Sequence, residues 1–428
     1  MRVSGPATSR VAADILGEVP KPRHAVFREF LDATGDPLDK GIALFFRAPH
    51  SYTGEDVLEL HGHGGPVVLD LVVQRVIALG ARTARPGEFS ERAFLNGKLD
   101  LAQVEAVADL IESGTASAVR AAVRSLQGEF SRRVHRLVDD LIGLRTYVEA
   151  AIDFPDEGVE ARDDQKVDDD LKGLCGTLDS LLESAQQGSL LRDGMTIVLT
   201  GRPNVGKSSL LNALACRDIA IVSSIPGTTR DILHEQLQID GMPLHVMDTA
   251  GLHDSPDEIE GEGMRRAKRA MAQADHILLV IDDSETGNTE DTEVLEHLPA
   301  DLERTVVRNK IDLSGRVPGA VRRSGRAEVA ISAKTGAGIE DLRTYLKHRM
   351  GYRPAGEGVF MARRRHLEAL RRARSHVVAA NARRLGSRSS ELVAEELRLA
   401  QLALGEITGE FTPDNLLGRI FESFCIGK

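Results

Sequence analysis

The chain has 428 residues and a formal net charge of −11 at pH 7. This length predicts two or three domains, each with a hydrophobic core. The acidic balance excludes a protein that holds RNA through a general excess of positive charge. Its three cysteines, Cys175, Cys216 and Cys425, show neither disulfide nor metal-ligand spacing. The sequence contains no recognisable signal peptide or membrane-spanning apolar run, so we expect a cytoplasmic protein that does not use a membrane.

The first 97 residues differ in composition from those that follow. Glycine, proline and β-branched residues are frequent, and the run Gly62 to Pro66 predicts a tight glycine-rich turn. Glu59 lies in an otherwise apolar strand pattern, Val57 to Leu60, where a carboxylate is costly without a partner. Residues 1–97 are therefore predicted to form a small α+β domain.

Residues 98–193 and 351–428 share a helical character. Both are rich in Ala, Leu, Glu and Arg, and the run Leu99 to Ile111 repeats its apolar positions at helical spacing. Helical sequence on both sides predicts one helical domain into which residues 194–350 are inserted. The stretch Ala362 to Arg388 has nine arginines and one glutamate. It is either a surface for tRNA or a protein partner, or a solvated helical face.

A phosphate-binding loop lies near the start of the inserted segment. The run Gly201 to Ser208 reads G-R-P-N-V-G-K-S, between a buried strand pattern at Met195 to Thr200 and a helix start at Ser209. Glycines let the backbone wrap a polyphosphate, Lys207 can reach the outer phosphates, and Ser208 can ligate Mg²⁺. The context of strand, loop and helix favours a nucleotide site over a chance match.

Four further motifs follow in order, three of them directly after predicted strands. Thr229 can complete a Mg²⁺ site, and Asp248 can hold Mg²⁺ through water. The carboxylate of Asp312 can accept two N–H donors from guanine, a pair that adenine lacks, so we expect GTP to be preferred over ATP. The series predicts an α/β fold of the Ras-like P-loop type. The four motifs are Gly227 to Asp231, Asp248 to Gly251, Asn309 to Asp312 and Ser332 to Lys334.

These motifs and their flanks resemble the MnmE (TrmE) family of tRNA modification GTPases. The resemblance covers essentially the whole chain and implies an N-terminal α+β folate-type domain, a helical domain and an inserted Ras-like P-loop G domain. The flanking motifs are Tyr52 to Val57, Gly62 to Gly65, Arg85 to Phe94, Ile152 to Asp156 and Cys425 to Lys428. The GTP-binding residues that the resemblance implies are Asn204, Val205, Gly206, Lys207, Ser208, Ser209, Ser223, Ser224, Ile225, Pro226, Gly227, Thr228, Thr229, Asp248, Thr249, Ala250, Gly251, Asn309, Lys310, Asp312, Ser332, Ala333 and Lys334.

The resemblance also implies a biological role. Members work with a flavin-dependent partner, MnmG, to add a carboxymethylaminomethyl-type group to C5 of the wobble uridine (position 34) of certain tRNAs. Expected partners are a second copy of the chain, an MnmG-type flavoprotein in a heterotetramer, and tRNA, with FAD bound only by the flavoprotein. The one-carbon unit would come from tetrahydrofolate in its 5,10-methylene or 5-formyl form. Its expected contacts are Arg2, Glu59, Lys98 and Lys428, each of which also reads as a plain surface charge.

The hydrolytic site departs from that of many small GTPases. Leu252 stands where they place a water-orienting glutamine, so a second device is needed. The resemblance implies K⁺ between dimerised G domains, held by Asn204, Ser223, Ile225 and Thr228, and Mg²⁺ held by Ser208 and Thr229. Two residues would serve catalysis, namely Lys207 and Glu260, although Glu260 also reads as a solvated acid in an acidic loop.

Three alternatives stay open. An Era-like or Der-like ribosome-assembly GTPase shares the G motifs but lacks the N-terminal domain and the terminal motif. Cys425 is either a thiol that acts near the folate or a plain free thiol. Family members carry further residues ahead of the position of Met1, so this sequence would begin in mid-strand. Either its start codon is misassigned or the protein is truncated, and for the sequence as given we expect weakened folate binding and dimerisation.

Overall fold

The computed structural model describes residues 1–153, 162–215, 234–248, 274–285, 302–323, 326–353, 358–387, 390–410 and 420. They fall into two compact units. The first unit comprises Met1–Ala108, Leu126–Val159 and Ala379–Lys428, and the second comprises Asp109–Ser125 and Glu160–Val378. Within the described part of the chain, every helix is too short or too polar to cross a membrane.

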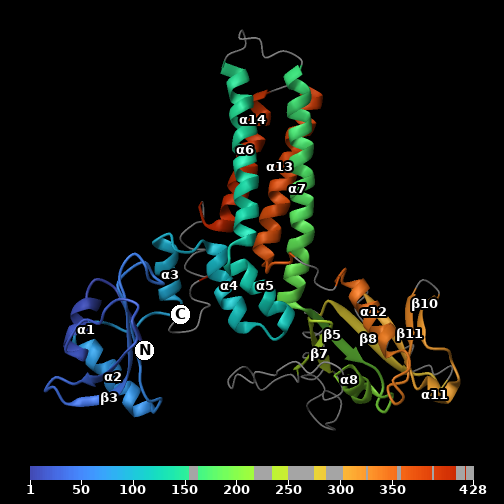
Figure 1. Cartoon of the computed structure of the whole chain (residues 1–428). Coiled ribbons are helices and arrows are strands. Elements are labelled where there is room, and N and C mark those ends of the chain that lie inside the picture. Colours follow the sequence, from blue (N-terminus) through green and yellow to red (C-terminus); the bar gives the residue numbers. More distant parts are fainter. Residues whose placement is uncertain are drawn as a thin grey trace, which may run out of the picture. The chain divides into compact units, whose positions relative to one another are not determined.

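The first unit begins with a four-stranded antiparallel sheet in the order β1-β4-β3-β2 (Figure 1, blue). Two helices cover one face, because alternate residues of the strands, such as Ala43 and Phe45, are buried against Val11 and Ile15. Strand β1 forms one edge, and its register sets Arg2 opposite Glu59. The elements are β1 (Arg2–Ser4), α1 (Thr8–Leu16), β2 (Val26–Leu31), β3 (Pro37–Phe46), β4 (Val57–His61) and α2 (Pro66–Ala78).

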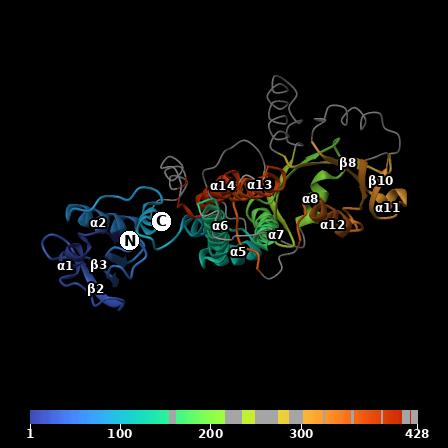
Figure 2. The same cartoon turned by 90° about the horizontal axis from the view of Figure 1, so that it is seen from above.

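The rest of the first unit is helical. Helix α6 packs along α14, and Figures 1 and 2 both show the two helices side by side. Its buried residues recur at helical spacing, as in Phe130, Val134, Leu137 and Leu141. These helices are α3 (Glu88–Leu95), most of α4 (Leu101–Glu112), α6 (Glu129–Asp153) and α14 (Ser390–Thr408).

The second unit is built on a seven-stranded sheet in the order β10-β11-β9-β8-β5-β7-β6. Its five inner strands are parallel, and the two edge strands run antiparallel to their neighbours. All seven residues of β8 are buried, as expected for a central parallel strand. The elements are β5 (Met195–Thr200), α8 (Lys207–Ala215), β6 (His234–Ile239), β7 (Met242–Asp248), β8 (His276–Asp282), β9 (Arg304–Asn309), α11 (Ile311–Ser314), β10 (Gly319–Arg323), β11 (Arg326–Ala330) and α12 (Ile339–Arg349).

The chain enters and leaves this sheet at neighbouring points. Gln187, near the end of the helix before β5, donates to the carbonyl of Gly351 at 2.8 Å and accepts from the backbone N–H of Arg353 at 2.9 Å. Ser125 exchanges hydrogen bonds with the backbone of Met361 at 2.8 and 3.1 Å. The segments that precede and follow the parallel sheet are therefore hydrogen-bonded to each other, as expected for an inserted domain. The flanking helices are α5 (Ala116–Leu126), α7 (Arg162–Asp193) and α13 (Arg364–Ser387).

Candidate functional site

The phosphate-binding loop connects β5 to α8 in the second unit. Gly201 and Gly206 have φ of 143° and 96°, values that favour glycine. A side chain at Gly201 would collide with the carbonyl oxygen of Val280, and one at Gly206 would collide with the side-chain amide of Asn309. Both glycines are therefore required, because the loop runs directly against its neighbours.

Lys207 is the first residue of α8 and is only 7% exposed. Its ammonium group donates to the carbonyl oxygens of Gly201 and Arg202 at 2.7 and 2.8 Å. Ser208 and Ser209 follow on the exposed first turn, where the helix presents free N–H groups and the positive end of its dipole. Cation, backbone donors and helix terminus converge on one place, so this arrangement fits a polyphosphate.

Asn309 connects three of the predicted motifs. It is 2% exposed, donates to the carbonyl of Val205 in the loop at 2.9 Å, and accepts from the backbone N–H of Ala333 at 2.9 Å. Asp312 accepts a hydrogen bond from the hydroxyl of Ser332 at 2.6 Å. The loop and the motifs after β9 and β11 therefore form one site, as expected for strands whose carboxyl ends meet at one edge of a sheet.

Strand β7 brings Asp248, the first residue of a fourth motif, to the same edge. It pairs in parallel with β5, and Asp248, its last residue, lies opposite Leu199. The backbone of Asp248 therefore lies next to the strand that leads into the phosphate-binding loop. Its position directly after the apolar run Leu244 to Met247 predicted this placement from the sequence.

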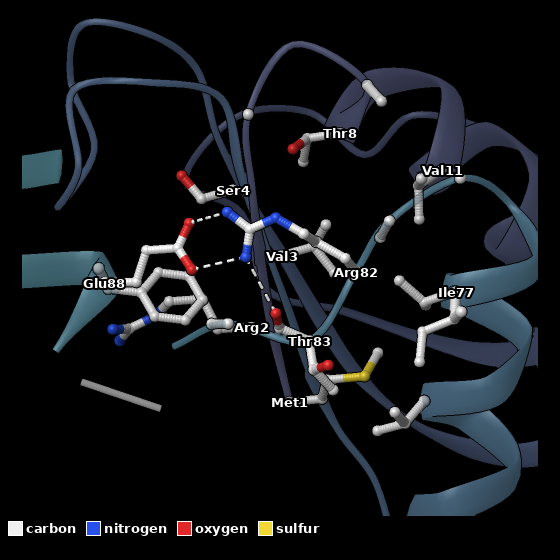
Figure 3. A pocket seen from close by; sticks show the side chains of 18 of the residues that line it. Met1, Arg2, Val3, Ser4, Thr8, Val11, Ile77, Arg82, Thr83 and Glu88 are labelled. Carbon is white, nitrogen blue, oxygen red and sulfur yellow. Dashed lines mark hydrogen bonds and ion pairs between the residues drawn. The ribbon is translucent and has the colours of Figure 1, made fainter. Parts of the chain in front are cut away.

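The first unit contains a cavity of about 730 Å³ (Figure 3). Its walls come from β1, β4, α1, α2, the turn before α3 and α3 itself. Val3, Val11 and Ile77 supply apolar surface, whereas Arg82 and Glu88 lie at its polar side. The full lining is Met1, Arg2, Val3, Ser4, Gly5, Pro6, Ala7, Thr8, Val11, Glu59, His61, Val73, Val76, Ile77, Gly80, Ala81, Arg82, Thr83, Ala84, Glu88, Phe89 and Arg92.

Glu88 is the centre of a charge network at this cavity. It is 4% exposed and accepts hydrogen bonds from Arg82 at 2.5 and 2.8 Å and from Arg92 at 2.8 Å. Nε of Arg92 at 3.3 Å and the backbone N–H of Arg85 at 2.8 Å also donate to it. The hydrogen bonds from Arg82 are the largest cause of the lowered pKa of Glu88, which is about 2. Burial alone would raise this pKa. The lowered pKa keeps Glu88 charged at neutral pH. Arg92 also pairs with Glu55 at 2.9 Å.

Arg2 occupies a second charged position on the cavity wall. It donates to Glu59 from Nε at 2.9 Å, and its Nη2 lies 2.8 Å from the same oxygen. Its guanidinium carbon lies 5.3 Å from the ring centre of Tyr52 and 5.6 Å from that of Phe89. These rings and the carboxylate fix the guanidinium in place.

Comparison with known proteins decides the family. Residues 1–98 match the family model of the GTP-binding protein TrmE N-terminus, and residues 101–425 match that of the MnmE helical domain. The tRNA modification GTPase MnmE of Methylococcus capsulatus is 58% identical, over all of this chain and 95% of that protein. The chain belongs to the MnmE family of tRNA modification GTPases. The same-named protein of Yersinia pseudotuberculosis is 55% identical over the same shares. A crystal structure of Aquifex aeolicus Era is 26% identical and covers 42% of this chain and 66% of its own, with a TM-score of 0.28.

Membership of the MnmE family confirms the predicted fold class. It also confirms the resemblance drawn from the flanking motifs, and the chain is a GTPase of this family. The described residues bring together Lys207, Asn309 and Asp312 with their neighbouring motifs. A large part of the predicted MnmE-type site lies outside the described residues. The metal sites stay predictions, since only Asn204 and Ser208 of their expected ligands are described, and so does Glu260. The predicted positions outside the described residues are Ser223, Ser224, Ile225, Pro226, Gly227, Thr228, Thr229, Thr249, Ala250, Gly251, Glu260 and Lys428, together with Cys216, Leu252 and Cys425.

Of the four expected folate contacts, the described structure places two at the cavity and one away from it, and Lys428 lies outside the described residues. Arg2 and Glu59 meet on the cavity wall. Lys98 does not line this cavity and donates to the carbonyl of Pro49 at 3.0 Å. Sequence reasoning gave no role to Arg82 or Glu88, although the motif Arg85 to Phe94, which includes Glu88, was part of the family resemblance.

Proposed function

We propose that this chain binds and hydrolyses GTP in the addition of a carboxymethylaminomethyl-type group to C5 of the wobble uridine of certain tRNAs. It acts in the cytoplasm with an MnmG-type flavoprotein that carries the FAD. The observation that carries the GTPase half is Asn309, which joins the phosphate loop to the base-reading motifs. The functional division is residues 1–97 for tetrahydrofolate and dimerisation, 98–193 with 351–428 as the helical domain, and 194–350 for GTP.

Each residue of the nucleotide site has a distinct task. Lys207 offsets negative charge on the β- and γ-phosphates, more so as charge moves in the transition state. Asp312, oriented by Ser332, accepts the two N–H groups of guanine. Bound Mg²⁺ would neutralise phosphate oxygens, with Ser208 and Thr229 as its protein ligands. Glu260 orients the attacking water, since Leu252 cannot form a hydrogen bond.

A monovalent cation is the second device for hydrolysis. Asn204 lies exposed on the loop with φ of 61°, an uncommon conformation for a residue other than glycine. With Ser223, Ile225 and Thr228 it offers neutral oxygens, which suit K⁺. The cation would act where two G domains meet, and a second copy of the chain supplies the other side.

Turnover of GTP in K⁺ and Na⁺ at equal ionic strength tests this site. We expect hydrolysis of GTP but not ATP, faster in K⁺, with the K⁺ advantage reduced in Asn204→Ala. Asn96→Ala is the matched control, because Asn96 belongs to the first unit and donates to the carbonyl of Thr53. Equal turnover of ATP and GTP contradicts the guanine assignment, and equal rates in K⁺ and Na⁺ contradict the cation site.

The N-terminal cavity supports a tetrahydrofolate site. About 730 Å³ is the usual size for a small-molecule pocket, and the walls combine apolar surface with a few fixed charges. Arg2 and Glu59 offer a donor and an acceptor to a pteridine. Calorimetry with 5-formyltetrahydrofolate should show that Glu59→Gln weakens binding, whereas Glu29→Gln, at an exposed pair with Lys40, does not. Unchanged affinity in Glu59→Gln would place the ligand elsewhere.

Dimerisation through the first unit is supported by its exposed apolar side chains. Phe27 and Ile42 are cross-strand partners on the outer face of the sheet, and both are exposed. Val67 on α2 is exposed as well. We propose that a second copy of the chain packs against part of this exposed apolar surface. Phe27→Lys should shift the chain toward monomer in sedimentation, and an unchanged mass would exclude this face.

Mass spectrometry of wobble uridines tests the pathway. A strain that lacks this chain should lose the C5 modification, and the wild-type chain should restore it while Lys207→Ala should not. The alternative, an Era-like or Der-like ribosome-assembly GTPase, predicts normal wobble uridines and defective ribosomal subunits in the same strain.

A further inference from the structure

Two consecutive carboxylates lie at the end of the central strand β8, and neither belongs to the sequence motifs of the nucleotide site. Asp282 is the last residue of β8, opposite Asn309 in the neighbouring strand β9, and Asp283 follows it. Both are buried, at 6% and 2% exposure. Buried carboxylates are costly unless they are paired, so their partners show what they hold in place.

Asp282 holds the lysine of the base-reading motif. One of its oxygens lies 2.6 Å from the ammonium group of Lys310. The other accepts from the backbone N–H and the hydroxyl of Ser284 at 3.0 and 2.6 Å. Burial acts to raise the pKa of Asp282, but the hydrogen bonds from Lys310 and Ser284 outweigh it and lower that pKa. The carboxylate is therefore charged when it meets the ammonium group.

Lys310 has an unusual backbone conformation that needs support. Its φ is 65°, in the left-handed region that costs about 1 kcal/mol or more for a residue with a side chain. It forms the N-cap of α11, the four-residue helix that carries Asp312. The ion pair with Asp282 fixes the side chain of Lys310 and so supports its left-handed backbone conformation.

Asp283 holds the other end of the same helix. Its carboxylate accepts from the hydroxyl of Ser314, the last residue of α11, at 2.6 Å and from Nε of Arg316 at 2.8 Å. Its backbone N–H donates to the carbonyl of Asn309 at 2.9 Å. A helix of four residues cannot sustain itself, because nucleation is unfavourable and few bonds reward it. Its order must come from such contacts.

We propose that Asp282 and Asp283 are positioning residues that clamp both ends of the base-reading segment 309–316 before guanine arrives. They act through Lys310, Ser314 and Arg316 and do not themselves touch the base. Because the segment is already ordered, guanine binding does not bear the free-energy cost of ordering it. The inference rests on the proposed assignment of Asp312 to guanine.

The test is nucleotide affinity of the full-length chain, measured with fluorescent GDP and by competition with GTP and ADP. Asp282→Asn should weaken GDP and GTP about 5- to 10-fold alike, since both share the base. The weak binding of ADP, which does not use Asp312, should change less than twofold. The KM for GTP should rise more than kcat falls, because the loss is in ground-state binding.

Asp275→Asn is the matched control. Asp275 lies just before the opposite end of β8 and likewise accepts from a backbone N–H, that of Thr196 at 2.8 Å. It should leave all three affinities unchanged. Equal losses for GDP and ADP in Asp282→Asn would indicate general damage to the fold and would overturn the proposal.

A double-mutant cycle isolates the pathway of the effect. In a Lys310→Met background, Asp282→Asn should cause little further loss of GDP affinity, because the partner is gone. Fully additive losses overturn the clamp. For Asp283, Arg316→Gln removes one contact and leaves the hydrogen bond from Ser314 in place, so misfolding is not expected, and it should weaken GDP binding two- to threefold. If the wild-type chain fails to bind GDP, the proposed function fails, and not this inference alone.

Discussion

The nucleotide site and the N-terminal cavity solve the problem of ligand binding in opposite ways. The first is built from loops that follow parallel strands, and glycines and main-chain groups supply much of its surface. The second is built from side chains of two antiparallel strands, three helices and a turn, held by ion pairs such as those of Glu88. A site made of loops needs residues at fixed spacing, whereas a site made of paired side chains needs only charges that meet in space.

The largest effect should come from Lys207→Ala. Loss of the ammonium group that bridges the loop carbonyls should lower GTP turnover at least ~100-fold. Colorimetric phosphate release measures this. Lys172→Ala, on the exposed surface of α7, is the control and should leave turnover unchanged. Affinity for 5-formyltetrahydrofolate should not change in either variant, and a matching loss there would break the distinction between the two sites.

Glu88→Gln should damage the cavity and spare the nucleotide site. Removal of the charge leaves Arg82 and Arg92 without the carboxylate that they share, and among the described residues only Arg92 keeps another carboxylate partner, Glu55, so local stability should fall. Protection of β4 amides against hydrogen exchange measures it. Glu91→Gln on the same helix breaks only a pair with Arg85, whose side chain is 68% exposed, and should cost under about 1 kcal/mol. Similar losses in both variants would show that the network is not special.

Acid should affect the two units in different pH ranges. Burial, with a smaller contribution from Arg349, lowers the pKa of His276 from 6.5 to about 4. The unfolded chain then binds more protons than the folded one between these values, so stability falls as pH falls from 6.5 to 4. The pKa of Glu88 is lowered from 4.5 to about 2, so its contribution is lost only between those values.

We therefore expect the parallel sheet to lose about 2 kcal/mol between pH 7 and pH 5 while the first unit stays unaffected by Glu88. Protection factors of β8 and β4 amides at both pH values measure this. His276→Gln, which keeps a hydrogen-bonding group beside Thr305, should remove the loss in β8. An equal pH response in the variant would assign the loss to another group.

The smallest effect concerns the ring beside Arg2. Tyr52→Leu removes one of two aromatic neighbours of the guanidinium and should weaken folate binding about threefold, as expected for ~0.5–1 kcal/mol. Tyr52→Phe keeps the ring and loses only the hydrogen bond to Ser90. Calorimetry should rank Tyr52→Phe with the wild type. The opposite order would mean that the hydroxyl, not the ring, supports the site.

This contrast explains what the sequence could predict. Lys207, Asn309 and Asp312 were identified in advance, because each occupies a fixed place in a motif after a buried strand. Arg92 and Glu55 are 37 residues apart, and no spacing rule connects them. The meeting of Arg2 with Glu59 depends on strand register, which the sequence did not predict; the family resemblance supplied only the expectation that both residues contact folate. Asp282 and Asp283 were missed because their partners in the base-reading segment, Lys310, Ser314 and Arg316, are brought to them by loop geometry beyond β9.

Helices α6 and α14 pack together but leave the ribosome at very different times, because they are far apart in the sequence. Arg145 of α6 donates to Gln401 of α14 at 2.7 Å across 256 residues of sequence. At roughly 5–20 residues per second, about 13 to 50 s separate the appearance of these two positions from the ribosome. The whole parallel sheet emerges in that interval. We expect nascent chains that end before α14 to crosslink to ribosome-bound chaperones through α6, and chains that include α14 to lose that contact.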